Sequence, residues 1–249
     1  SREFSNPRKR MSAGFFPRPY QVPHPRLDPR WIATVHLALV RAFELIRADG
    51  FDLTSASEDD ISFKLEEEFM NRLIPGSDSE LDLSFIVNVT RESATANYDQ
   101  SSIGRKPDFV FHLNRHELCQ SHNRVQDCLY AECKPVGRAH SLNQHYCAVG
   151  KKTSGIERFI CGAYASSMEQ GMMIAYVKDG FQITRDLANA LNQPKARAGL
   201  GQPNDLSCVT EANSMHTQGL YLTTHQRLFP WPDGQNATPI DLYHSWHEC

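Results

Sequence analysis

The chain has 249 residues, of which 40% are hydrophobic and 22% are charged, and its net charge is −3. A chain of this length can bury a substantial core, and the composition excludes a disordered, fibrous or polycationic protein. It contains no run of about 18 apolar residues, so we expect no membrane span. The first residues lack the layout of a secretory signal and the seven cysteines follow no framework spacing. We therefore expect a cytoplasmic protein with reduced thiols.

Positive charge gathers at the start of the chain. Residues 1–30 carry seven Lys or Arg side chains against two acidic ones, a local charge of +5 that leaves −8 for the remainder. We expect a basic, Pro-rich and irregular arm over 1–27 and a single domain over 28–249. The arm could lie on nucleic-acid phosphates, or it could be a charged and mobile terminus.

The first helix is predicted from about Asp28 to Asp49. Asp28 can cap it, and Pro29 suits the first helical position. Gly50 ends it. Apolar residues recur on one face, at Ile32, Val35, Leu39, Phe43 and Ile46. This spacing is typical of a helix that packs against a core.

A second helix is predicted over 57–74. Ser57 with Asp60, or Ser55 with Glu58, resembles a capping box. The buried face of this helix is marked by Ile61, Leu65, Phe69 and Leu73.

Glu58 and Glu67 lie differently on this second helix. Glu58 projects onto the centre of the apolar face, one turn before its first apolar residue, whereas Glu67 lies on the far side. Two interpretations of Glu58 are open: an acid at the edge of a site, or a first-turn acid that the helix dipole favours.

Further elements follow from periodicity. A helix is predicted from 154 to 168, with Ser154 and Glu157 as a capping box, and a short helix over 183–191. A loop is expected over 194–214. The last two predicted strands could pair as a hairpin that extends the sheet. Strands are predicted at 81–91, 107–113, 128–134, 172–177, 219–227 and 240–246.

Chemistry gathers on two of these strands. Asp108 lies at the start of one strand, and Glu132 and Lys134 share a face of the next because they are two residues apart. Two carboxylates and a backbone carbonyl are a sufficient protein contribution to a Mg²⁺ site. A lysine beside such a metal can have a lowered pKa, or it can orient water and counter negative charge. This combination suits phosphodiester hydrolysis.

Pro107-Asp108, followed by Glu132-Cys133-Lys134, resembles the PD-(D/E)xK nuclease superfamily, which has the restriction-endonuclease-like fold. The resemblance covers about 55–177 and leaves 178–249 as a C-terminal extension. It implies an α/β fold whose core is a mixed four-stranded sheet flanked by helices. Here the N-terminal helix and the C-terminal hairpin would be additions to that core.

The same resemblance implies roles for individual residues. Asp108, Glu132 and the carbonyl of Cys133 would ligate Mg²⁺, with Mn²⁺ as a possible substitute, and Lys134 would be the catalytic lysine. Glu58 would be the third acid, or Glu67 in its place.

The function that the resemblance implies is a Mg²⁺-dependent DNA endonuclease in restriction or anti-phage defence. Its partners would be DNA and a protein partner or a second copy of the chain. Two alternatives stay open: an effector subunit that is silent without its partner, and a binding module of the same fold without activity.

Several other residues are candidates with two interpretations. Gln144, Lys151, Lys152, Arg158 and Tyr164 could assist the substrate, although for Arg158 a solvated first-turn charge is slightly favoured.

Two further groups lie outside the expected centre. His225 and Arg227 could reach phosphates or, as we prefer, scaffold the hairpin on a solvated face. Trp231, Tyr243 and Trp246 are expected to pack rather than to stack on bases.

The polar loop between the strands predicted at 107–113 and 128–134 contains residue types that bind zinc. His116, Cys119, His122 and Cys128 supply imidazole and thiolate groups, but their spacing matches no standard finger. Isolated His and Cys side chains in a polar loop are the alternative interpretation.

Overall fold

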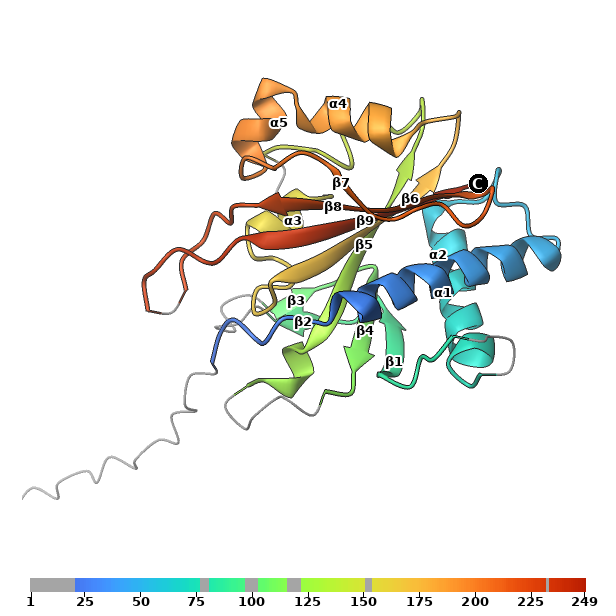
Figure 1. Cartoon of the computed structure of the whole chain (residues 1–249), viewed down its shortest axis with the longest axis horizontal. Coiled ribbons are helices and arrows are strands. Elements are labelled where there is room, and N and C mark those ends of the chain that lie inside the picture. Colours follow the sequence, from blue (N-terminus) through green and yellow to red (C-terminus); the bar gives the residue numbers. More distant parts are fainter. Residues whose placement is uncertain (1–20, 77–80, 97–102, 116–121, 151–153, 232) are drawn as a thin grey trace, which may run out of the picture.

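The computed structural model describes residues 21–76, 81–96, 103–115, 122–150, 154–231 and 233–249. Two sheets run through these residues. The larger has seven strands in the order β1-β4-β5-β6-β9-β8-β7, and β2 pairs with β3 (Figure 1). The strands are β1 (Ile86–Arg91), β2 (Thr95–Ala96), β3 (Ile103–Arg105), β4 (Phe109–Leu113), β5 (Cys128–Val136), β6 (Gln170–Val177), β7 (Ser207–Thr210), β8 (Thr217–His225) and β9 (Ile240–Glu248). The expected α/β class with a mixed sheet is confirmed.

The seven-stranded sheet is mixed, with parallel strands in its centre and antiparallel strands on both sides. Strands β1, β4 and β5 are antiparallel neighbours, β5, β6 and β9 run parallel, and β9, β8 and β7 are antiparallel again. All residues of β6 are buried, as the continuous apolar run predicts for a strand covered on both faces. The predicted hairpin of β8 and β9 is confirmed, and β9 joins it to β6.

Five α-helices occur in the described ranges, together with shorter helical turns. They are α1 (Pro29–Ala48), α2 (Glu58–Glu68), α3 (Glu157–Ile160), α4 (Ala188–Leu191) and α5 (Pro194–Gly199). Two π-helical turns adjoin them, Phe69–Leu73 after α2 and Ile183–Leu187 before α4, and a 3₁₀ turn spans Arg124–Gln126. None of the described helices is long and apolar enough to cross a membrane.

The first two helices form where the sequence predicts them. Asp28 caps α1 by accepting a hydrogen bond from the Arg30 amide. Ser57 and Asp60 form a reciprocal capping box at the start of α2, 3.2 Å from Asp60 N to Ser57 Oγ. The alternative start fails because the Ser55 hydroxyl donates to Asp52 instead.

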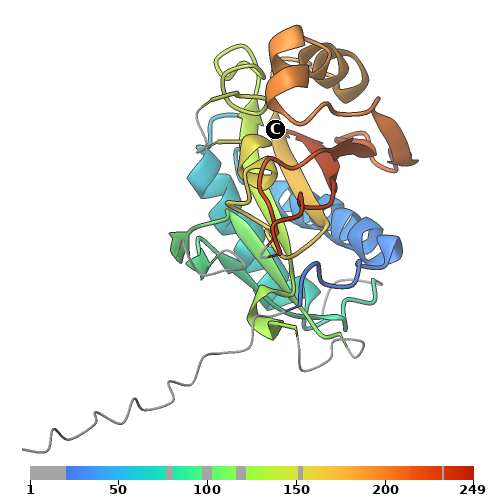
Figure 2. The same ribbon diagram turned by 90° about the vertical axis from the view of Figure 1, so that its left-hand side faces the viewer.

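Helices cover both faces of the sheet (Figure 2). Helix α1 packs on one face, where Phe43 stacks on His247 with ring centroids 4.5 Å apart. Helix α3 packs on the other face against β6. A Cβ at Gly171 would lie 2.6 Å from the Phe159 ring, so the helix approaches the strand backbone directly.

The prediction of a helix over 154–168 is wrong. Only α3 forms, because both capping-box side chains take partners elsewhere: Ser154 donates to the His145 carbonyl, and Glu157 accepts from the Gly150 amide. The chain then turns back, with a positive φ of 76° at Gly162. The expected loop over 194–214 is also wrong, since it contains α5 and β7.

The arm expected over 1–27 is ordered at its end. Residues 1–20 lie outside the described residues, but Leu27 is buried and both its N–H and its C=O bond to the Gln170 side chain. Arg115 donates to the carbonyls of Pro25 and Arg26. The segment from residue 21 onward is therefore part of the folded unit.

The C-terminal hairpin is scaffolded by buried polar groups. His225 Nδ1 lies 2.7 Å from the Leu200 carbonyl oxygen, and Arg227 donates to the carbonyls of Thr238 and Ala165. The scaffold interpretation is confirmed, although the expectation of a solvated face is wrong because both side chains are buried. Packing roles are likewise confirmed for the buried Trp231, Tyr243 and Trp246.

The six cysteines in the described residues are free thiols.

Candidate active site

The site lies where β4 stops pairing with β5. The last partners are Phe109 and Ala131, and one further step of the same register sets Asp108 opposite Glu132. Beyond this point β5 continues to Val136. The edge of β5 that faces β4 is therefore open just where the chemistry-bearing residues lie.

Where the strand pairing has ended, a side chain bonds to a backbone group of β5. Asp108 Oδ2 accepts a hydrogen bond of 2.6 Å from the Cys133 amide. On the other side of the chain, the Pro107 carbonyl accepts a hydrogen bond from the Glu92 amide, which follows β1. The pairing of β4 with β5 thus ends at Phe109, and Asp108 directs its carboxylate to the backbone of β5.

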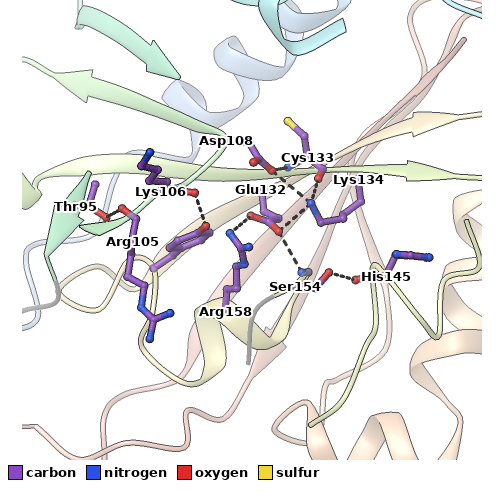
Figure 3. Close-up of polar contacts among 12 residues, drawn as sticks. Thr95, Arg105, Lys106, Asp108, Glu132, Cys133, Lys134, His145, Ser154 and Arg158 are labelled. Carbon is purple, nitrogen blue, oxygen red and sulfur yellow. Dashed lines mark hydrogen bonds and ion pairs between the residues drawn. The ribbon is translucent and has the colours of Figure 1, made fainter. Parts of the chain in front are cut away.

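The Lys134 ammonium lies among four oxygen atoms. Its Nζ is 3.0 Å from Glu58 Oε1, 3.0 Å from Glu132 Oε1 and 3.6 Å from Asp108 Oδ2. It also donates to the carbonyl oxygen of Cys133. Figure 3 shows Asp108, Glu132 and Lys134 pointing toward one another. The residues expected to form one centre do lie together, and we call these four oxygens the oxygen nest.

Of the two candidate third acids, Glu58 reaches the nest. The capping box makes Glu58 the first residue of α2, and its side chain is about one-third exposed, at 32%. Glu67 pairs instead with Lys64 at 2.6 Å, where both side chains are 39% exposed. Position on the apolar face, inferred from the helical period, therefore distinguished the two acids.

The charges at the site influence each other strongly. The Glu132 side chain is fully buried, and desolvation followed by repulsion from Asp108 raises its pKa to about 7. Burial alone would lower the pKa of Lys134, but the Glu132, Asp108 and Glu58 carboxylates outweigh it and raise that pKa above its ordinary value. The lysine is therefore an ammonium here. Its expected roles narrow to orienting groups and countering charge.

Arg158 completes the surroundings of Glu132. Its Nη1 lies 3.1 Å from Glu132 Oε2, and its guanidinium carbon lies 4.9 Å from the centroid of the Tyr164 ring. The slightly favoured interpretation of Arg158 as a solvated charge is wrong. A helical projection could not reveal this contact because α3 ends at Ile160.

The oxygen nest resembles a Mg²⁺ site in its ligand types but not in its distances. Three carboxylates and a carbonyl are the hard oxygen donors that this ion prefers. With Lys134 and Arg158, the five charged groups sum to −1. The carboxylate oxygens lie 3.0 to 3.6 Å from Nζ, about 1 to 1.5 Å beyond the distance of Mg²⁺ ligands. The donor types fit the ion, provided the ammonium leaves and the oxygens draw in.

As the side chains lie, no three His, Cys, Asp or Glu groups in the described residues are placed to hold a metal ion. At the nest, the ammonium stands between the three acids. Comparisons with known proteins add no further constraint: no family model, no curated protein and no solved structure matches this chain. The geometry and the residue pattern carry the functional argument.

The remaining candidates lie elsewhere. Cys128 contacts His112, with Sγ 3.4 Å from Nδ1, and the His122 ring packs edge-on to His24. Gln144 and Lys195 line a pocket that includes none of the nest residues. Two zinc candidates, His116 and Cys119, and two substrate candidates, Lys151 and Lys152, lie outside the described residues.

Proposed function

We propose that the chain is a Mg²⁺-dependent DNA endonuclease that hydrolyses phosphodiester bonds. The observation that carries the proposal is the oxygen nest: Glu58, Asp108, Glu132 and the Cys133 carbonyl surround one cationic group. Three neighbouring acids that include the fully buried Glu132 cost folding free energy unless a cation compensates them. Such a cluster at the open edge of a strand is therefore more economically explained by a cation-dependent function than by packing.

The sheet supports the resemblance to PD-(D/E)xK nucleases. Strands β1, β4, β5 and β6 would form the mixed four-stranded core, and β9, β8 and β7 would extend it. Asp108 then precedes the second core strand, and Glu132 and Lys134 lie within the third. DNA as the substrate and a role in restriction or anti-phage defence follow from this resemblance alone.

Glu58, Asp108, Glu132 and the Cys133 carbonyl would hold Mg²⁺ or Mn²⁺ in this proposal. Bound there, the ion would act as a Lewis acid and neutralise the charge that develops on the phosphodiester. With the ion in place, Lys134 would lie outside the nest and would direct its N–H groups at the attacking water or at a phosphate oxygen. Glu132 keeps one oxygen on Arg158, so its orientation does not depend on the ion.

Cleavage of DNA tests this function. Supercoiled plasmid is incubated with Mg²⁺ and wild-type protein, Glu132→Gln or Lys134→Met, with Glu67→Gln as the matched acid outside the nest. We expect nicking or cutting by the wild type and Glu67→Gln, and none by the other two. Full Mg²⁺-dependent cleavage by Glu132→Gln or Lys134→Met would refute the mechanism.

A nuclease subunit that needs a partner is the second candidate. One observation favours it: the ammonium fills the nest, and the Lys134 side chain is only 12% exposed. If a partner must release this lysine, the isolated chain will bind Mn²⁺ weakly and cut only when a co-purified protein or a second copy is added. Metal-independent DNA binding without any Mn²⁺ binding would instead support a silent module of the same fold.

A further inference from the structure

The two carboxylate oxygens of buried Glu132 have different neighbours. Oε1 accepts from the Gly155 amide at 3.2 Å and lies 3.0 Å from Lys134 Nζ, at the oxygen nest. Oε2 accepts from Arg158 Nη1 at 3.1 Å. Because a carboxylate turns as one plane, holding Oε2 outside the nest fixes where Oε1 points.

Arg158 is held by Tyr164. The guanidinium lies over the Tyr164 ring, and the turn between the two residues is closed by a hydrogen bond of 3.0 Å from the Tyr164 amide to the Arg158 carbonyl. The ring itself is buried, with 2% of the residue exposed. A long side chain that would otherwise sample many rotamers is thereby restricted to the one that reaches Glu132.

Tyr164 also reaches the segment that bears Asp108. Its hydroxyl donates a hydrogen bond of 2.6 Å to the carbonyl oxygen of Lys106, two residues before Asp108. A continuous path therefore runs from Glu132 through Arg158 and Tyr164 to the start of β4. It spans the gap where the ladder between β4 and β5 has ended.

We propose that Arg158 and Tyr164 are positioning residues that fix the spacing and orientation of Asp108 and Glu132 for the reaction. This inference rests on the proposed function and adds a purpose for two residues that supply none of the four nest oxygens. Arg158 acts on the orientation of Glu132, and Tyr164 acts on the segment that carries Asp108.

The two residues should leave different traces on metal binding. Arg158→Met removes a positive charge beside the nest, which favours a divalent cation electrostatically, while it frees the Glu132 carboxylate to turn. Tyr164→Phe keeps the charge and the ring but removes the bond to Lys106. A loss of turnover without a loss of Mn²⁺ affinity is therefore particular to Arg158→Met.

The experiment measures kcat for plasmid cleavage and the Kd for Mn²⁺ by calorimetry in Arg158→Met, Tyr164→Phe and the double variant. Arg197→Met, at an exposed residue of α5, is the matched control. We expect kcat of Arg158→Met to fall about 10- to 100-fold, with the Kd unchanged or lower. For Tyr164→Phe we expect both kcat to fall and the Kd to rise. The double variant should lose less than the product of the single losses, because one path is broken twice.

Three results would overturn the inference: a kcat of Arg158→Met equal to that of the control, a Kd that rises in proportion to the loss of kcat, or fully multiplicative losses in the double variant. If Arg158→Met does not fold, the test uses Tyr164→Phe instead. A kcat and a Kd of Tyr164→Phe that both equal those of the wild type would then refute the proposal.

A failure of the proposed function looks different, because the wild type itself then neither binds Mn²⁺ nor cuts DNA. The path is still tested in that case by the unfolding midpoints of the metal-free single and double variants. Additive shifts of those midpoints would refute the coupling between Arg158 and Tyr164.

Discussion

Lys134 Nζ and Glu132 Oε1 lie 3.0 Å apart on the same face of β5, and the Glu132 side chain is fully buried. Each group satisfies the other in the metal-free chain. The same oxygen is the one that would face a divalent cation. In the proposed function the ammonium occupies the place that Mg²⁺ would take, and the two cations would compete for it.

Lys134→Met should expose this competition. Removing the ammonium leaves three acids without their common cation, and breaking a mostly buried pair of this kind costs about 3–5 kcal/mol. We expect a lower free energy of unfolding in EDTA and a larger stabilisation by Mn²⁺ than in the wild type. Denaturant unfolding with and without Mn²⁺ measures both. Equal Mn²⁺ stabilisation of the two proteins would contradict competition at this position.

Glu58→Gln and Glu67→Gln form a matched pair on α2. Glu58→Gln removes one nest oxygen charge, so we expect weaker Mn²⁺ binding and slower cleavage. Glu67→Gln removes only an exposed pair with Lys64, which is worth less than about 0.5 kcal/mol. Calorimetry on both variants decides the identity of the third acid. Weaker binding by Glu67→Gln alone would reverse the assignment.

Gly171→Ala should disturb the site from behind. The added Cβ would lie 2.6 Å from the Phe159 ring, and overpacking of this kind costs about 1–3 kcal/mol. Because Phe159 adjoins Arg158 on α3, we also expect slower cleavage. The second variant, Gly171→Ala with Phe159→Leu, should recover part of both losses. No recovery would indicate that the contact with the ring is not the cause.

Buried histidines make the fold sensitive to acid. Desolvation lowers the pKa of His36 and His225 to about 4 and, together with repulsion from His225, that of His244 to about 3. Histidine side chains in the unfolded chain have their ordinary pKa of about 6.5, so below that pH the unfolded chain binds more protons than the fold. The free energy of unfolding therefore falls as the pH falls from about 6.5 toward 4. At pH 5 each of these histidines lowers the free energy of unfolding by about 2 kcal/mol.

Urea unfolding at pH 7.5, 6 and 5 measures this loss. Carboxylates whose pKa is lowered in the fold act at lower pH. Glu132, whose pKa is raised to about 7, gains stability as the pH falls through this window and offsets about one of the three histidines. A free energy of unfolding that stays constant from pH 7.5 to 5 would show that these histidines are protonated in the fold.

The strands and the acids were accessible from sequence because each depends on local pattern. Alternation placed Glu132 and Lys134 on one face, and the Pro-Asp pair marked the start of β4. The helical period put Glu58, and not Glu67, on the buried side of α2. These features need only the nearest turn or strand to be right.

Other features depend on partners far along the chain. Ser154 and Glu157 satisfy the capping-box pattern, yet the His145 carbonyl and the Gly150 amide take their side chains. Strand β7 carries exposed side chains at Ser207, Cys208 and Val209, so it shows no apolar alternation. Arg158 looked like a surface charge because nothing local predicts its path to Glu132 through the turn that ends at Tyr164.

Mn²⁺ anomalous scattering from a soaked crystal tests the central claim most directly. The account predicts a peak among the oxygens of Glu58, Asp108, Glu132 and Cys133, with Lys134 Nζ moved out of the nest. It is contradicted if saturating Mn²⁺ leaves no peak there and the ammonium stays among the four oxygens.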